Sequence, residues 1–364
     1  MKGQCTILML AVAAVSLAGC ALELGFPPAA DVQFSFNTEG PGQVIAAGQP
    51  AFVEGAVFDT ISGRSGHHAA TLTAFPDGEL LAAWYSYAGP GELDGSAIYT
   101  ARLPAGAGSW EALVLQLDQP HGLGNPVLYS EGDEVWLFHA VAPGGWSSAH
   151  IEVQRSHDRG QSWSRTAAIG GPIGSNVRYP PLRTADGDLL LPGYDDLLQR
   201  SLFFVSGDGE SWTLRSAVWS DSPHQNVQPS LVRLDSGRLL ATMRNVGKDW
   251  LWVTASDDGG RSWARPRNSG FANPGSAAQL LRLRSGNLLL VFNDSPSERR
   301  PLSIALSPDE GRSWTLPKAV ADGDSTYSYP AAIQTPDGLI HVLYSRGRES
   351  IRHTVLNEPW IASP

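Results

Sequence analysis

The sequence predicts an all-β protein, a six-bladed β-propeller built from four-stranded antiparallel blades. A turn motif that ends in tryptophan occurs four times, and these tryptophans lie 49, 51 and 51 residues apart. A hairpin glycine recurs six times, at spacings of 54, 55, 50, 49 and 52 residues. The segments between the turns are apolar or alternate with polar residues, as strands do. The six hairpin glycines are Gly78, Gly132, Gly187, Gly237, Gly286 and Gly338.

Each residue type that recurs in the tryptophan turns has a structural role. In the copy Ser156-His-Asp158-Arg-Gly160-Gln-Ser162-Trp163, the Asp accepts hydrogen bonds from nearby backbone N–H groups and the Gly takes a positive φ. The Trp fills the space beneath. The Asp residues of these turns are therefore predicted to be structural. The other copies end at Trp212, Trp263 and Trp314, and a degenerate copy ends at Trp110.

The strands follow from the same spacing. Around the first hairpin, the sequence predicts strands over 70–75 and 80–84. The final blade is predicted to have strands around 329–334, 339–344 and 350–356, after which the chain stops. Its missing outer strand is predicted to come from 43–58, which closes the ring and removes an open edge.

The N-terminus is interpreted as a bacterial lipoprotein signal. Lys2 precedes an apolar run over 6–18 that is too short to span a bilayer, and Leu17-Ala-Gly-Cys20 has the form of a cleavage box. We therefore expect a signal peptide over 1–19, lipidation of Cys20, a tether over 20–42 and one propeller domain over 43–364. The protein is expected to be exported and anchored by lipid to the cell envelope, at the outer membrane or cell surface.

Charge and composition narrow the partners. The net charge of −10 disfavours nucleic acid. Neither His139 nor His150 has the spacing of a metal site, and the sequence has no Cys/His cluster, so no metal and no cofactor is expected. The expected partner is a glycan, with membrane contact through the lipid anchor only.

Equivalent positions of the repeat gather polar residues at the strand ends opposite the hairpins. These ends are predicted to surround the central channel and form a ligand site, although solvated strand ends remain an alternative. Seven residues after the hairpin glycines come Tyr85, His139, Tyr194, Arg244, Asn293 and Ser345. Nine or ten residues before four of them come His68, Arg178, Gln228 and Tyr329.

Several segments resemble the Asp-box sialidases and, more closely, the sialidase-like branch of BNR-repeat propellers. The resemblance covers roughly residues 50–356 and is strong evidence for the fold but weaker evidence for the reaction. The segments that carry it are Phe75-Pro-Asp-Gly-Glu-Leu-Leu-Ala-Ala-Trp84, Asn125-Pro-Val-Leu128, Gln228-Pro-Ser-Leu-Val-Arg-Leu234, Asn273-Pro-Gly-Ser276, Arg299-Arg-Pro-Leu302 and Tyr327-Ser-Tyr-Pro330.

The resemblance implies roles for individual residues. Sialidases hold the sugar carboxylate with three arginines, use a Tyr nucleophile assisted by a Glu, and manage the leaving group with an Asp. Arg244 matches the second arginine and Arg299 the third, while Tyr329, rather than its neighbour Tyr327, matches the nucleophile. Asp94 is similar in place to the acid, with Glu92 as a competitor.

Two positions depart from the family pattern. His68 stands where the first arginine is expected, and Gln228 stands where the Glu that activates the tyrosine is expected. Glutamine cannot accept a proton, so the tyrosine needs another base or has another task. His68 is expected to titrate near its reference pKa of about 6.5, and thus to strengthen the grip on a carboxylate when protonated and to serve as a base when neutral.

Together these residues predict a sialidase-like exo-glycosidase that removes a terminal acidic sugar. The expected catalytic residues are Tyr329, Asp94 and His68. The expected substrate-binding residues are Arg244, Arg299, Gln228, Arg178, Tyr85, Tyr194 and Asn293. Two other functions stay open: a uronate-directed polysaccharide lyase in which His68 or Tyr329 removes a proton, and a glycan-binding protein without catalysis.

Structural roles for the same residues also stay open. Arg244 and Arg299 would be structural if they paired with acids such as Asp249 or Glu298. Tyr329 would then cap the core, Asp94 would only form a turn, and the pair at 67–68 would be buried histidines that bind the backbone.

Overall fold

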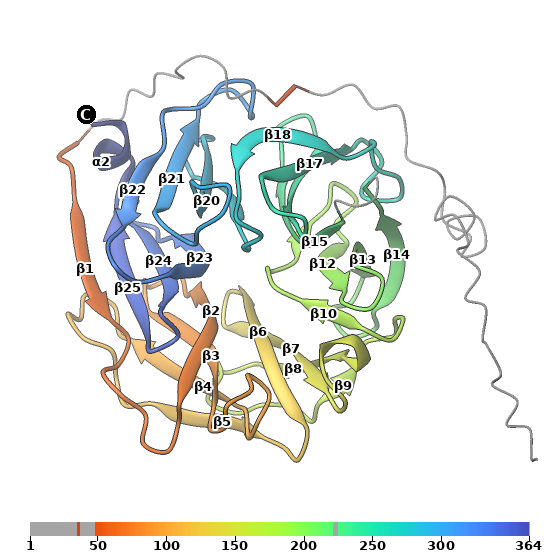
Figure 1. Ribbon diagram of the computed structural model, residues 1–364, viewed down its shortest axis with the longest axis vertical. Coiled ribbons are helices and arrows are strands. Elements are labelled where there is room, and N and C mark those ends of the chain that lie inside the picture. The colour runs from red at the N-terminus through yellow and green to blue at the C-terminus, as the bar shows by residue number, and fades with distance from the viewer. Residues whose placement is uncertain (1–34, 37–47, 221–224, 364) are drawn as a thin grey trace, which may run out of the picture.

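The computed structural model describes residues 35–36, 48–220 and 225–363. The chain forms six sheets arranged around a central axis, so the predicted six-bladed β-propeller is confirmed (Figure 1). The signal peptide, the lipidated Cys20 and the tether over 20–42 lie outside the described residues. Within the described ranges, no helix has the length and apolar character needed to cross a membrane.

The blades follow one another along the chain, each with its strands in antiparallel order from the axis outward. Blade 1 has β2 (Gly66–Ala74), β3 (Leu80–Tyr87), β4 (Ala97–Leu103) and β5 (Val114–Asp118). Blade 2 has β6 (Gly122–Glu131), β7 (Glu134–Ala142), β8 (His150–Ser156) and β9 (Ala167–Ala168), with a 3-10 helix η1 (Trp146–Ser148) between β7 and β8.

Blade 3 has an interrupted innermost strand. Its two pieces, β10 (Ser175–Val177) and β11 (Leu182–Arg183), both pair with β12 (Leu189–Asp195). The ladder is broken between them because Pro180 and Pro181 have no N–H to donate. The blade continues with β13 (Arg200–Ser206) and β14 (Thr213–Val218).

The remaining blades keep the four-stranded pattern. Blade 4 has β15 (Asn226–Arg233), β16 (Leu239–Asn245), β17 (Trp250–Ser256) and β18 (Arg267–Ala272). Blade 5 has β19 (Gln279–Arg282), β20 (Leu288–Asn293), β21 (Leu302–Ser307) and β22 (Lys318–Ala321). Blade 6 has β23 (Tyr327–Gln334), β24 (Ile340–Arg346) and β25 (Ser350–Leu356), followed by a short helix α2 (Glu358–Ala362).

The ring closes with the N-terminal strand, as the sequence predicts. The strand β1 (Phe52–Ala56) pairs antiparallel with β25, with Phe52 opposite Leu356 and Ala56 opposite Arg352. Figure 1 shows β1 beside β25 at the outer edge of blade 6. This pairing gives the last blade its fourth strand and ties the two ends of the propeller together.

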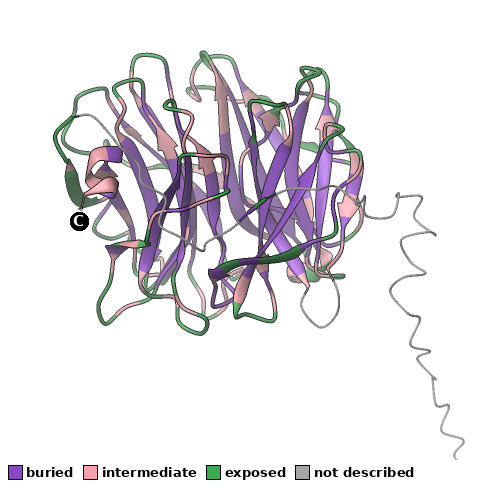
Figure 2. Cartoon of the chain, turned by 90° about the horizontal axis from the view of Figure 1, so that it is seen from above, coloured by how far each residue is buried: buried purple, intermediate pink, exposed green. Residues whose placement is uncertain are grey.

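The core lies between neighbouring blades. Its clusters join strands of adjacent sheets; one includes Leu240 of blade 4 and Leu290 of blade 5. Figure 2 shows buried strands through the body of the disc, with exposed residues concentrated in the connecting loops. All six hairpin glycines have positive φ, from 62° to 93°, so each can adopt the turn that its position requires.

The tryptophan turns also have the predicted structure. In the third copy, Asp258 Oδ1 accepts hydrogen bonds from the backbone N–H groups of Arg261 at 3.0 Å and Ser262 at 2.9 Å, and Gly260 has a φ of 82°. Trp263 is buried below the turn. Burial alone would raise the pKa of Asp258, but the hydrogen bonds from Ser262 and Arg261 outweigh it and lower that pKa.

We expect Asp258→Ala to lower the melting temperature by several degrees near neutral pH, because two turn N–H groups lose their acceptor. A carboxyl whose folded-state pKa is lowered stabilises the fold above its unfolded pKa of about 3.9, and this contribution disappears as the pH falls through the lower folded value. Thermal unfolding of both proteins should therefore show a smaller difference in acid. The exposed Asp59 serves as control, and an equal effect of Asp59→Ala would contradict the assignment.

Candidate functional site

The innermost strands carry a repeated β-bulge. The register shifts in β2, β6, β15 and β23, and a residue in each bulge has a left-handed backbone. The φ values are 52°, 46°, 53° and 57° at Ala69, Asn125, Gln228 and Tyr329. Such values are unusual for side chains other than glycine and cost about 1–3 kcal/mol each. Bulges re-aim side chains, and here they include two of the predicted site residues, Gln228 and Tyr329.

Arg178 holds two of these bulges in place. Its guanidinium is buried and donates to four backbone carbonyls, at 3.3 Å to Ala69, 3.0 Å to Ala70, 2.6 Å to Tyr329 and 3.1 Å to Pro330. Arg178 therefore links blade 3 to blades 1 and 6 across the axis. Its hydrogen bonds are made to the backbone, so it positions Tyr329, whereas the sequence suggested that it binds substrate.

The Tyr329 hydroxyl lies between two hydrogen-bond donors. Arg244 Nη1 lies 3.1 Å and Gln228 Nε2 3.2 Å from Tyr329 Oη. Arg244 Nη1 also donates to Gln228 Oε1 at 3.4 Å. Because a guanidinium can only donate, this contact places the amide oxygen toward Arg244 and the amide N–H toward Tyr329. Within the described part of the chain, Tyr329 Oη accepts these hydrogen bonds and donates none.

This arrangement stabilises the deprotonated tyrosine. Burial alone would raise the pKa of Tyr329, but the positive charges of Arg244 and Arg299 and the hydrogen bond from Gln228 outweigh it and lower that pKa. The Arg299 guanidinium carbon lies 5.5 Å from the centre of the Tyr329 ring. Tyr327, two residues earlier, instead donates to the carbonyl of Asp322 at 2.8 Å and packs against Tyr344.

Arg244 and Arg299 have no carboxylate partner among the ion pairs of the described residues. The structural pairs considered from the sequence do not form, since Glu298 binds Arg300 at 2.6 Å and Asp249 binds neither arginine. Arg299 donates to the carbonyl of Gly275 at 3.3 Å, and burial lowers its pKa. Two guanidinium groups without an ion-pair partner among the described residues, beside one phenol, can bind an anion.

His68 joins the same group in its neutral form. Its ring centre lies 4.2 Å from that of Tyr329, and its Nδ1 is 2.9 Å from the hydroxyl of Ser345. Burial lowers the pKa of His68 well below its ordinary value, and the charges of Arg348, Arg299, Arg178 and Arg244 lower it further. The expectation that His68 titrates near 6.5 and grips a carboxylate when protonated is therefore wrong, because the ring is buried and arginines surround it.

Tyr329, Arg244, Arg299, Gln228 and His68 are called the arginine–tyrosine cluster below. They come from blades 1, 4, 5 and 6. Of the other predicted residues, Tyr194 contacts the cluster, because its Oη accepts a hydrogen bond from Gln228 Nε2 at 3.4 Å. Asn293 instead binds the carbonyls of Pro301 and Tyr327, at 3.2 and 2.8 Å, and so braces the segment that follows Arg299.

The loop after β3 contributes Glu92 rather than Asp94. Glu92 Oε2 accepts a hydrogen bond from Tyr85 Oη at 2.9 Å, and Glu92 Oε1 forms an ion pair with Arg348. The Asp94 carboxylate accepts the backbone N–H of Gly91 at 2.8 Å, as a turn-forming residue does. Tyr85 therefore orients Glu92. Asp94 forms a turn, which is the structural alternative to its predicted role as the acid.

Sequence reasoning missed Arg348. It lies in the turn between β24 and β25, with a φ of 63°, and its carbonyl accepts the N–H of His67 at 2.8 Å. The equivalent turns of blades 1 to 4 have no arginine and that of blade 5 carries Arg299, so the repeat gave no consistent signal for Arg348. The repeated X-Pro pairs at Asn125, Gln228 and Tyr329 were, in contrast, a usable signal for the bulges.

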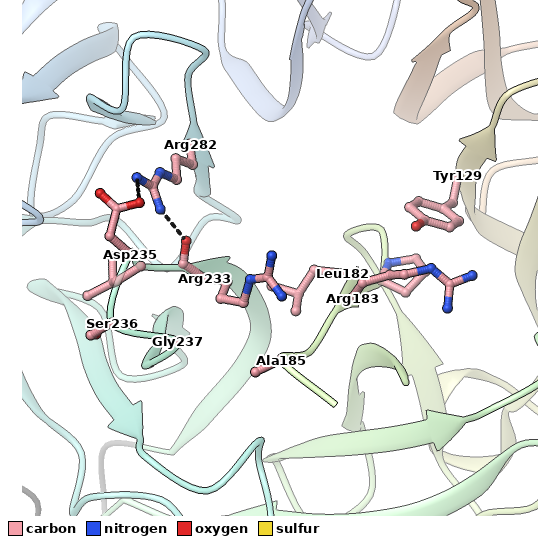
Figure 3. A pocket seen from close by; sticks show the side chains of 11 residues that line it. Tyr129, Leu182, Arg183, Ala185, Arg233, Asp235, Ser236, Gly237 and Arg282 are labelled. Carbon is pink, nitrogen blue, oxygen red and sulfur yellow. Dashed lines mark hydrogen bonds and ion pairs between the residues drawn. The ribbon is translucent and has the colours of Figure 1, made fainter. Parts of the chain in front are cut away.

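The hairpin face of the propeller has a different character. A depression of about 760 Å³ there is lined by arginines that each stand four residues before a hairpin glycine (Figure 3). Arg282 binds Asp235 at 2.6 Å and the carbonyl of Arg233 at 3.0 Å, and Arg183 binds both oxygens of Glu131. The acids neutralise these two arginines, so the arginine–tyrosine cluster is the better candidate for an anionic ligand.

No metal site is evident in the described ranges, where no three His, Cys, Asp or Glu side chains gather as ligands would. His139 and His150 both approach Glu152, at 3.5 and 3.2 Å.

Comparisons with known proteins agree with the propeller fold. The family model for the BNR repeat-like domain matches residues 78–342. A sialidase of Micromonospora viridifaciens is 25% identical over 88% of this chain, which spans only 57% of that protein's length.

Among solved structures, a Hadza microbial sialidase superposes with a TM-score of 0.70 at 18% identity, over 80% of this chain and 66% of its own. The intramolecular trans-sialidase of Ruminococcus gnavus gives 0.69 at 14% identity, over 83% and 96%. At these identities the solved structures support the fold alone.

Proposed function

Because this chain belongs to the BNR-repeat, sialidase-like family, we propose that it is an exo-glycosidase that hydrolyses a terminal acidic sugar, sialic acid or a related one, from glycans. The observation that carries the proposal is the environment of Tyr329 Oη, which faces two donors and lies beside two arginines without carboxylate partners. The matched relative from Micromonospora viridifaciens is a sialidase, which supports the same chemistry.

Arg244 and Arg299 would bind the carboxylate of the sugar. Each guanidinium can offer two parallel N–H groups, and such charge-assisted hydrogen bonds contribute about 1.5–3 kcal/mol each. Burial strengthens this attraction, because less water screens the charges.

Tyr329 would then act as the nucleophile. A carboxylate nucleophile would be repelled from a carbon that bears a carboxylate. The phenolate of Tyr329 suits such a carbon because the positive charges of Arg244 and Arg299 offset its own. The absence of the expected Glu is compensated electrostatically: Arg244 and Arg299 lower the pKa of Tyr329, so less help from a base is needed. In this proposal Gln228 orients the phenol oxygen and does not take its proton.

A second candidate function is a uronate-directed polysaccharide lyase. The neutral His68, in contact with the Tyr329 ring, favours it, because a neutral imidazole can accept the proton next to a sugar carboxylate. Arginine would neutralise that carboxylate, and no nucleophile would be required.

An assay of the protein lacking its first 20 residues separates these functions. The panel contains chromogenic sialosides, uronides, neutral glycosides and a uronic-acid polymer. Release of a terminal acidic sugar without a new double bond supports the glycosidase, whereas absorbance of an unsaturated product supports the lyase. Glycan binding without any product after long incubation would support a non-catalytic role and contradict the proposal.

We also propose that the protein is exported and held at the bacterial cell envelope by a lipid on Cys20. Replacing Cys20 with Ser should move the protein from the membrane fraction to the soluble fraction and abolish incorporation of labelled palmitate, because a lipidated cysteine supplies the anchor. Cys5→Ser is the matched control, since the signal peptide that contains it is removed. Membrane association that survives Cys20→Ser would contradict the anchor.

A further inference from the structure

One carboxyl group near the arginine–tyrosine cluster, that of Asp196, has no role in the proposed function so far. Asp196 lies directly after β12 and is partly exposed. Asn176 Nδ2 donates to Asp196 Oδ2 at 2.9 Å, and the Asp196 backbone N–H donates to the carbonyl of Gly174 at 2.9 Å. Among the hydrogen bonds and ion pairs of the described residues, none includes Asp196 Oδ1. One carboxyl oxygen is thus fixed and the other is available.

A chain of hydrogen bonds connects Asp196 with Tyr329. The Asn176 amide accepts from Asn125 Nδ2 at 3.0 Å, and Asn125 Nδ2 also donates to Tyr194 Oη at 3.0 Å. Gln228 Nε2 then bridges the two phenol oxygens, at 3.4 Å to Tyr194 and 3.2 Å to Tyr329. Buried polar side chains that satisfy one another in this way hold fixed positions. The four connecting residues, all buried, are Asn176, Asn125, Tyr194 and Gln228.

Burial, together with the groups around it, makes both protonation states of Asp196 accessible. The pKa of Asp196 is raised to about 6, mainly by burial. The hydrogen bond from Asn176 and the charge of Arg244 lower this pKa, and the charge of Asp195 raises it. Asp195 is itself paired with Arg200 at 3.1 Å. Tyr194, on the same strand, stays protonated, because burial and the charge of Asp196 raise its pKa.

Two other acids near the cluster are already engaged. The Asp94 carboxylate caps its own turn, and Glu92 is bound by Tyr85 and Arg348. Asp294, after β20, also has a raised pKa through burial, but no hydrogen bond or ion pair of the described residues links its carboxylate to the cluster.

We propose that Asp196 is the proton-exchanging carboxyl of this site, in the role that the resemblance suggested for Asp94. The inference rests on the proposed glycosidase function. Asp196 donates its proton to the glycosidic oxygen while the bond from that oxygen to the anomeric carbon breaks and the phenolate oxygen of Tyr329 bonds to the carbon. Asp196 then takes a proton from water, whose oxygen bonds to the carbon as the bond to Tyr329 breaks, which restores both groups.

The test compares Asp196→Asn with Asp294→Asn on two glycosides of the same acidic sugar. One has a nitrophenyl leaving group, which departs without a proton, and the other has an alkyl leaving group, which needs one. We expect Asp196→Asn to lower kcat/KM about 10²-fold on the alkyl glycoside, the usual scale of general acid catalysis, and less than about tenfold on the nitrophenyl glycoside. Asp294→Asn should change neither.

The pH profile gives a second readout. The donor form of Asp196 exists below its pKa, so wild-type activity on the alkyl glycoside should fall as the pH rises through about 6. This limb should be absent in Asp196→Asn. In the protein without ligand, carbon NMR of labelled Asp should show a carboxyl that titrates near this pH in wild type and not in the variant.

The outcomes are distinct. Equal losses on the two glycosides would mean that Asp196 only supports the structure, and would overturn this inference alone. The same holds for an active enzyme that Asp196→Asn leaves unchanged, or for the absence of a carboxyl that titrates near pH 6. A wild-type protein inactive on both glycosides would overturn the proposed function and this step together.

Discussion

Tyr329→Phe should lower turnover of an acidic glycoside by about 10⁴-fold or more, because it removes the one atom proposed to bond to the sugar. The ring that packs on His68 remains, so the substitution changes the chemistry with little effect on packing. The measurement is kcat on the nitrophenyl glycoside, where proton donation to the leaving group matters least.

Two further measurements make this prediction specific. A fluorinated analogue of the substrate that traps a covalent intermediate should add its mass to the peptide with Tyr329 in wild type and to no peptide in the variant. Tyr129→Phe, on the hairpin face, is the matched control and should keep full activity. A variant at 329 that retains activity within about tenfold would exclude a covalent role for this residue, and would favour the lyase if an unsaturated product forms.

Arg244→Gln should lower kcat/KM by about 10³-fold, the upper range for loss of one electrostatic donor. Two effects combine here: the sugar carboxylate loses a partner, and Tyr329 Oη loses a donor that lies 3.1 Å away. The charge of Arg244 also lowers the pKa of Tyr329, so removing it raises that pKa.

The sign of the pH effect follows directly. If the phenolate attacks, activity rises as the pH increases through the pKa of Tyr329, and a higher pKa moves this rise to higher pH. The ultraviolet absorbance of phenolate, measured without substrate, should shift in the same direction. Arg284→Gln, an exposed arginine next to a hairpin, is the control. An unchanged pH profile in Arg244→Gln would remove Arg244 from the activation of Tyr329.

Arg299 differs from Arg244 in its contact with the tyrosine. It lies over the ring rather than within hydrogen-bond distance of the hydroxyl, and it donates a hydrogen bond to the carbonyl of Gly275. Its main role in the proposal is to bind the carboxylate, so its loss should be seen more in KM than in the pH profile.

Much of the fold was readable from the sequence because a propeller is periodic. The hairpin glycines set the number of blades, and the strands of blade 6 lie close to their predicted ranges. Closure by a strand near 52–56 also followed, because an incomplete last blade leaves an edge that needs a partner.

The site was readable only in part. The repeat placed Tyr329 and Arg244 at the same end of their blades, and the structure brings them within 3.1 Å of each other. It gave no signal for Arg348 or Asp196, because both lie in the connection after the second strand of their blade, beyond its last periodic position. Arg178 occupied a periodic position, but its length lets it reach carbonyls two and three blades away.

The sequence by itself determined the propeller, its six blades, its closure and the end of the strands at which polar residues collect, because turns and alternation depend on neighbours along the chain. Only the tertiary structure decided that His68 is neutral, that Tyr329 faces donors alone and that Glu92, rather than Asp94, contacts Tyr85. Charge and hydrogen bonding act through space, so the protonation of one side chain depends on groups hundreds of residues away.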